Sequence, residues 1–137
     1  MVISLGGNDF NHQHGNVPSN ETFNAAYIEF VTTVLETYPE STVLSVCGQG
    51  SPAEATFDPD NNRCSPCPHV EAATDEFWAS AAPEVAARVH YKLVPCDGSV
   101  VVGDDDIGCN GHKNQLGQAK VAAFLAPTVE SIMGWEL

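Results

Sequence analysis

The sequence predicts an α/β fold built around a parallel sheet. Three short runs of β-branched and apolar residues alternate with three longer stretches in which apolar residues recur at three- and four-residue spacing. Such alternation is typical of right-handed β-α-β units, which place parallel strands side by side. The first run leads into Gly6-Gly7-Asn8-Asp9, and open parallel sheets bind ligands at the carboxyl ends of their strands. The same pattern therefore predicts both a fold and a place for a site.

The first strand is expected at Val2–Leu5, a β-branched and apolar run. The polar residues of Phe10–Val17 follow as a loop at the mouth of the site. Ser19 or Asn20 is placed to cap a helix that Pro39 ends. The apolar positions of this helix are Phe23, Tyr27, Phe30, Val31, Val34 and Tyr38.

The later elements continue the alternation. In chain order they are a strand at Ser41–Cys47, a helix from about His69 to Ser80, a strand from about Arg88 to Val94 and a helix at Gln115–Met133, interrupted or bent at Pro127. Between them lie a long irregular stretch, Pro52–Pro68, and an acidic loop that contains Asp104–Asp106. Three strands are few for a parallel sheet that must be covered on both faces. We therefore expect a piece of a larger doubly wound, flavodoxin-like domain.

Composition excludes some classes of partner. The chain has 137 residues and a formal net charge of −13, which argues against binding to nucleic acids or anionic membranes, because both need clustered cations. It has no apolar run long enough to span a bilayer and no signal-peptide pattern at its start. Five cysteines and an Asn20-Glu21-Thr22 sequon are compatible with export of the parent protein. We expect a secreted protein.

Two stretches carry a family resemblance. Gly6-Gly7-Asn8-Asp9, together with the run from Asp106 through His112 to Asn114 and the following Gly117-Gln118-Ala119-Lys120, resembles the third and fifth sequence blocks of the SGNH (GDSL-type) hydrolases. The chain looks most like the secreted, acetylxylan-esterase-like enzymes of carbohydrate esterase family two. The resemblance implies a three-layer α/β/α fold and a carboxylic-ester hydrolase that deacetylates carbohydrate esters, with no cofactor and no metal.

The resemblance also implies that residues 1–137 form a single, N-terminally incomplete domain whose first strands are missing. The family's Gly-Asp-Ser nucleophile block would then lie before residue 1, and none of the serines in this chain has that context. We expect the chain alone to be inactive. The sequence leaves open whether it is a truncated gene model, a natural fragment or a pseudoenzyme.

Two catalytic residues follow from the matched positions. Asn8 matches the residue that donates its side-chain amide to the oxyanion hole, and His112 matches the general base. The simpler interpretations are a turn asparagine and a surface histidine. Both side chains are expected at the carboxyl edge of the sheet, close enough to serve one small ligand.

The triad acid departs from the family pattern. Cys109 stands three residues before His112, where most members carry Asp, and Asn110 stands two before it. In the carbohydrate esterase branch a backbone carbonyl can orient the histidine instead, which would give a Ser-His dyad. Asp106 is an outside candidate for the acid. The other histidines, His12, His14, His69 and His90, are expected to be structural or solvated.

The cysteines permit a rival class, a non-catalytic binding domain stabilised by zinc or disulfides. Cys64, Cys67, Cys109 and His112 have the residue types of a tetrahedral zinc site. We favour a disulfide from Cys64 or Cys67 to Cys109, and a second bridge between Cys47 and Cys96.

The last expectation concerns association. In the family's usual strand order the run Val2–Leu5 would lose a neighbouring strand and become an apolar edge of the sheet. Such edges pair with other chains, so we expect self-association through this strand.

Overall fold

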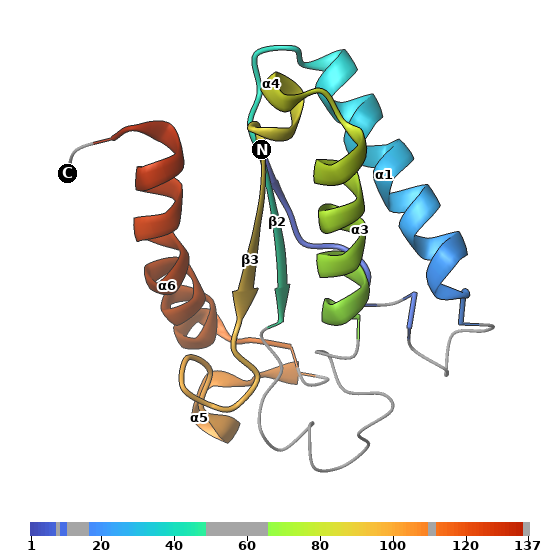
Figure 1. Ribbon diagram of the computed structural model, residues 1–137. Helices are drawn as coiled ribbons and strands as arrows, with labels where there is room; N and C mark the ends of the chain where they lie inside the picture. The colour runs from blue at the N-terminus through green and yellow to red at the C-terminus, as the bar shows by residue number, and fades with distance from the viewer. Residues whose placement is uncertain (8, 11–16, 49–65, 110–111, 136–137) are drawn as a thin grey trace. The chain divides into compact units, whose positions relative to one another are not determined.

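The computed structural model describes residues 1–7, 9–10, 17–48, 66–109 and 112–135 (Figure 1). The chain divides into two compact units. The first unit comprises Met1–Cys47 and Ser65–Leu93, and the second comprises Gly48–Cys64 and Val94–Leu137.

The first unit is built on a three-stranded parallel sheet in the order β1-β2-β3. The strands are β1 (Val2–Ile3), β2 (Val43–Gly48) and β3 (Val89–Val94), and the final residues of β2 and β3 count with the second unit. Val2 pairs with Leu44 and Ile3 with Ser45. The predicted α/β class and parallel sheet are confirmed, although β1 is two residues shorter than the expected Val2–Leu5.

Two long helices accompany this sheet, α1 (Asn20–Thr37) and α3 (Cys67–Ser80), and they lie side by side in Figure 1. The Ser19 side chain accepts a hydrogen bond from the Thr22 amide at 3.2 Å, which confirms Ser19 as the N-cap of α1. α3 begins two residues earlier than expected, because Pro66 and Pro68 fit the first turn of a helix, where no amide donor is needed. A short helix, α4 (Pro83–Ala86), was not expected from the sequence.

The core of the first unit lies between β2 and these helices. Residues 43–47 of β2 are all buried, as in a central strand of a parallel sheet. The buried apolar side chains from the helices are Phe23, Tyr27, Val31, Val34, Leu35, Val70, Ala73 and Phe77. The buried Ser45 hydroxyl is satisfied by the Tyr27 hydroxyl, 3.0 Å away. Burial raises the pKa of Tyr27, so this phenol stays neutral in the core.

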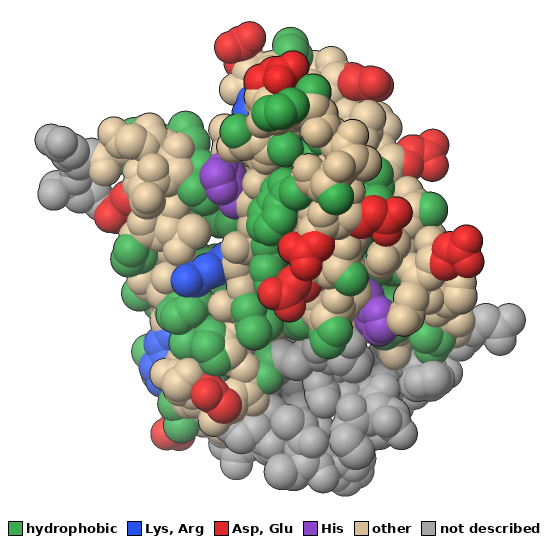
Figure 2. All heavy atoms as spheres, in the orientation of Figure 1, with side chains coloured by type: hydrophobic (Ala, Val, Ile, Leu, Met, Phe, Trp, Pro, Cys, Tyr) green, Lys and Arg blue, Asp and Glu red, His purple; other side chains and the backbone are tan. Residues whose placement is uncertain are grey.

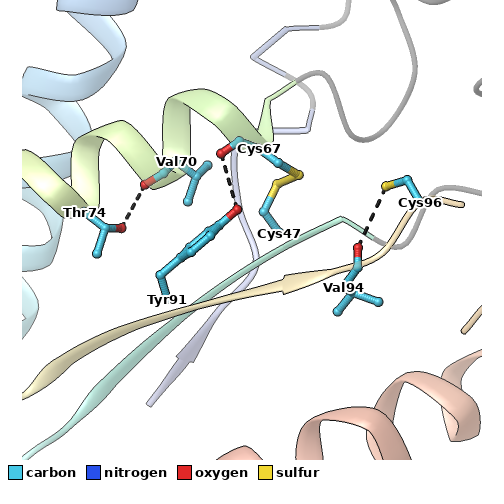
Figure 3. Close-up of a disulfide and its surroundings, with 7 residues drawn as sticks. All are labelled: Cys47, Cys67, Val70, Thr74, Tyr91, Val94 and Cys96. Carbon is cyan, nitrogen blue, oxygen red and sulfur yellow. Dashed lines mark hydrogen bonds between the residues drawn. A yellow bond between two sulfur atoms is a disulfide. The ribbon is translucent and has the colours of Figure 1, made fainter.

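A disulfide fastens β2 to α3 (Figure 3). Cys47, near the carboxyl end of β2, is bonded to Cys67, the first residue of α3, with a Cα–Cα distance of 5.4 Å. The Tyr91 hydroxyl donates a hydrogen bond to the Cys67 carbonyl at 3.4 Å, and burial raises the pKa of Tyr91 to about 12. The start of α3 is thus held both covalently and by a neutral phenol.

Acidic side chains are spread over the helical face of the first unit (Figure 2). They come from α1, α3 and α4 and include Glu21, Glu29, Glu36, Glu71, Asp75, Glu76 and Glu84. A surface of this charge repels the phosphates of nucleic acids.

The second unit contains α5 (Gly103–Asp106) and α6 (Gln115–Met133), which contact each other. α5 occupies a stretch expected to be an acidic loop. α6 has the predicted bounds and continues through Pro127 without interruption. It ends at Gly134, whose φ of 65° is the left-handed conformation that closes many helices. No helix in the described part of the chain has the length and apolar character needed to span a bilayer.

Candidate functional site

His112 is carried by a short loop between α5 and α6. The loop is closed by an antiparallel bridge between Ile107 and Lys113. Inside this bridge the Gly108 amide donates to the His112 carbonyl at 2.7 Å. Residues 110–111, between Cys109 and His112, lie outside the described part of the structure. The bridge gives His112 a defined backbone position just before the last helix.

The imidazole of His112 contacts a peptide carbonyl. Its Nδ1 lies 3.3 Å from the carbonyl oxygen of Cys109, and the same oxygen accepts the His112 backbone amide at 3.1 Å. With a proton on Nδ1, the ring donates to this oxygen and leaves Nε2 free to accept a proton. The side chain is exposed, so Nε2 is available to a reactant. The carbonyl contact thus holds the imidazole in one orientation with Nε2 pointing away from the Cys109 oxygen.

Asp106, the outside candidate for the acid, is committed elsewhere. Its carboxylate is fully buried, and Oδ2 accepts hydrogen bonds from the Lys120 ammonium at 2.7 Å and the Val102 amide at 2.6 Å. The Lys120 hydrogen bond, followed by that of Val102, holds the pKa of Asp106 below its usual range. Oδ1 has no hydrogen-bond partner among the described residues. The contacts of this carboxylate therefore join α5 to α6, while the His112 ring is held by Cys109.

Asn114 was not singled out from the sequence, and it supports the same loop. Its side-chain oxygen caps α6 by accepting from the amides of Leu116 and Gly117 at 2.9 and 3.0 Å. Its side-chain nitrogen donates to the Asp105 carbonyl at 2.8 Å. An Asn directly before a predicted helix is the signal that could have identified this residue. No comparable signal marks Lys120, which acts through a contact that only the fold creates.

Asn8 lies outside the described residues. It belongs to the first unit and His112 to the second, so their predicted proximity stays a prediction. The residues around Asn8 form a turn after β1, in which the Asp9 amide donates to the Gly6 carbonyl at 3.2 Å. Gly6 has a φ of 105°, which favours glycine.

Phe10 anchors the end of this turn. Its ring is buried, packs edge-on against Phe23 with centroids 4.9 Å apart, and stacks on the His69 ring at 4.2 Å. His69 is thus a packing residue, as expected. Half-buried His90 lies in β3, where burial lowers its pKa. His12 and His14 lie outside the described residues.

The cysteine predictions are corrected by the structure. Cys67 is bonded to Cys47, and Cys109 is a free, exposed thiol. The predicted bridge from Cys64 or Cys67 to Cys109 is therefore wrong. The predicted bridge between Cys47 and Cys96 is wrong as well, and Cys96 is disulfide-bonded in another way. The four-ligand zinc site fails as well, because a disulfide sulfur supplies no thiolate; Cys64 lies outside the described residues. Cys67 pairs with Cys47 because the fold brings the end of β2 next to the start of α3. The spacing of the cysteines in the sequence does not show this proximity.

Comparisons with known proteins bear on the fold. No family model matches the sequence, and no curated protein matches it significantly. A solved structure does match: a carbohydrate esterase family 2 (CE2) enzyme with a carbohydrate-binding domain from Corynascus thermopiles (Myceliophthora fergusii), with a TM-score of 0.72 and 22% identity over 98% of this chain. The chain shares the fold of this esterase. It spans 37% of the length of that chain. The resemblance recognised in two short motifs is confirmed at the level of the fold.

Proposed function

We propose that this chain is part of an SGNH-type carboxylic-ester hydrolase that removes acetyl or other short acyl groups from carbohydrate. The observation that carries the proposal is the contact between His112 Nδ1 and the Cys109 carbonyl, 3.3 Å apart, on the loop before the last helix. It supplies an oriented base at the position where the sequence motif calls for one. The fold shared with a carbohydrate esterase supports the same reaction class.

In the proposed reaction, Nε2 of His112 takes the proton of a serine hydroxyl as the serine attacks the ester carbonyl. The imidazolium that forms is held by its Nδ1–H donating to the Cys109 carbonyl. Asn8 donates its amide to the oxyanion, an interaction typically worth about 100- to 1,000-fold in rate. His112 then gives this proton to the departing sugar oxygen, which leaves as a hydroxyl, and an acyl-serine remains. Water, deprotonated by the same Nε2, attacks the acyl-serine, and the proton returns to the serine oxygen as the carboxylic acid departs.

The nucleophile is the component that these residues do not offer. None of the serines in the chain lies in a Gly-Asp-Ser context, so the proposal draws it from another segment of the protein. The matched esterase is longer than this chain, which covers 37% of it, and this leaves room for such a segment. The Cys47–Cys67 disulfide supports placing the protein in an oxidising, extracellular setting.

The test begins with the coding sequence upstream of Met1, read for a strand that ends in Gly-Asp-Ser. The polypeptide that includes it is assayed with p-nitrophenyl acetate and acetylated xylan. We expect His112→Ala to lower kcat by at least about 10³-fold, whereas His90→Gln, in β3 and outside the matched motifs, keeps the wild-type rate. Full activity in His112→Ala, or an active protein with no upstream serine, would overturn the proposal.

The 137-residue chain provides a second arm. With a base but no activated serine, it should give no stoichiometric release of p-nitrophenol in the first turnover. A burst that survives in His112→Ala would place the chemistry on other residues.

A further inference from the structure

We propose that Asp106 is a positioning residue for His112, because it fixes the base of the loop that carries the imidazole. The proposal rests on the proposed function only in taking His112 as the general base. Its structural content, that one buried carboxylate holds this loop in place, stands on contacts within the second unit.

The two ends of the loop meet at Asp106. The Asp106 carbonyl accepts the Asn114 backbone amide at 2.9 Å, and the next residue, Ile107, pairs with Lys113. The Asn114 side chain adds its bond to the Asp105 carbonyl at 2.8 Å. The residues that begin and end the loop are therefore hydrogen-bonded to each other at Asp106, and a shift of Asp106 would move both ends of the loop.

The Asp106 carboxylate fastens this point to α6. Lys120, in the second turn of α6, donates to Oδ2 at 2.7 Å, and the Val102 amide donates to the same oxygen at 2.6 Å. The first turn of α6 packs directly against the backbone of Asp106: a Cβ on Gly117 would lie 2.3 Å from the Asp106 carbonyl oxygen. Glycine is therefore required at this position. The loop base is held by side-chain and backbone contacts that act together.

Burial makes the Asp106 contacts hard to replace. The carboxylate is fully buried, and a buried charge is tolerated only when it is paired and hydrogen-bonded. Lys120 is 36% exposed and can turn to water if its partner is lost. Neutralising Asp106 therefore releases Lys120 and weakens the Val102 bond, which frees the loop base while α6 itself stays folded.

The loop carries its own reporters. The Asn114 amide is hydrogen-bonded to the Asp106 carbonyl at the base of the loop, so the rate at which it exchanges its hydrogen with solvent reports how often the base opens. The ¹⁵N shifts of the His112 ring report which nitrogen carries the proton, and the carbonyl contact favours the Nδ1–H tautomer. Neither measurement needs a serine or esterase activity.

The experiment compares Asp106→Asn with Asp97→Asn in the 137-residue chain. Asp97 is a matched control, because it also accepts a backbone amide, from Ser99 at 2.9 Å, in the same unit and outside the His112 loop. At temperatures where calorimetry shows both variants folded, we expect Asp106→Asn to raise the exchange rate of the Asn114 amide several-fold and to shift His112 towards a mixture of tautomers. Asp97→Asn should match the wild type.

Lys120→Met separates loosening of the loop from a simple effect of charge. It removes a positive charge, whereas Asp106→Asn removes a negative one, so an electrostatic effect on the base-catalysed exchange of the Asn114 amide would have opposite signs in the two variants. Loss of the Asp106–Lys120 contact predicts faster exchange in both. This variant also serves if Asp106→Asn does not fold. Wild-type exchange and tautomer in the folded variants, or rate changes of opposite sign, would overturn the proposal.

In the serine-containing polypeptide, loss of the Asp106 contacts with Lys120 and Val102 should lower kcat selectively. Misplacing a base by about 1 Å can cost on the order of 100-fold in rate, so kcat should fall in Asp106→Asn with little change in KM. If His112→Ala keeps full activity, the proposed function fails while the loop measurements still test Asp106. If His112 proves essential and Asp106→Asn retains wild-type kcat, the positioning role fails.

Discussion

At His112 the imidazole meets a peptide carbonyl instead of a carboxylate. A neutral acceptor makes a weaker hydrogen bond to an imidazolium than a charged one does, by roughly a factor of two. It nevertheless fixes the tautomer and the direction in which Nε2 points, which a base must have before it can act. Cys109, which stands where the family pattern has Asp, is therefore compatible with the proposed chemistry, because its backbone carbonyl supplies the acceptor.

Asp106 should give the protein an acid-sensitive component of stability. Its folded-state pKa is lowered from the usual 3.8 by Lys120 and Val102. Because unfolding releases it to its ordinary value, the unfolded state binds the proton more readily. The contribution is present above pH about 4 and is lost as the pH falls through the lowered folded pKa. Thermal unfolding of the wild type and Asp106→Asn between pH 2 and 7 checks this.

The variant should melt lower than the wild type near neutral pH, and the difference should shrink in acid. Asp97 also has a lowered pKa, caused by hydrogen bonds from Ser99. Asp97→Asn therefore shows how much of the stability lost at low pH comes from an exposed carboxylate. A difference between wild type and Asp106→Asn that stays constant down to pH 2 would contradict the assignment.

Among the elements, those with a complete local signal were predicted well. Helix α6 has its expected bounds, Gln115–Met133, because apolar residues recur at helical spacing along this stretch. Helix α5 was missed because its sequence, Gly103 to Asp106, has no apolar face. Its contacts with α6, including Asp106 to Lys120, are tertiary. The local pattern of apolar residues predicted the order of strands and helices. It could not predict contacts between residues far apart in the sequence, such as the Cys47–Cys67 disulfide.

The Cys47–Cys67 disulfide should stabilise the junction of β2 and α3. It closes a loop with a sequence separation of 20, for which the chain-entropy relation gives about 3 kcal/mol. We expect the double variant Cys47→Ala/Cys67→Ala to lose roughly this much free energy of unfolding in urea. Cys109→Ser, which removes a free exposed thiol, should leave the free energy unchanged.

Peptide mapping checks the pairing itself. Alkylation of the unreduced protein should label Cys109, and a peptide joining Cys47 to Cys67 should appear only without reductant. A crosslinked peptide containing Cys109 would contradict the structure.

For the whole molecule, the sheet of the first unit ends in an apolar strand. Within the described residues β1 has a partner on one side, β2, and lies at the edge of the order β1-β2-β3. Met1, Val2 and Leu5 are 51, 57 and 55% exposed. The edge carries no charged side chain or proline in this stretch, the usual means by which natural sheets avoid pairing with other chains. A net charge of −13 opposes association, but it acts over the whole surface, whereas strand pairing is local.

We therefore expect the 137-residue chain to self-associate through β1, in a manner that depends on protein concentration. Light scattering should show species larger than the monomer, and ANS fluorescence should report exposed apolar surface. Val2→Lys places a charge on the edge and should shift the equilibrium towards monomer. Tyr38→Lys is the matched control, because Tyr38 is 54% exposed but follows α1 and not the edge strand. Equal association in the two variants would assign the contact to another surface, and a monomer at every concentration without ANS binding would show that β1 does not pair.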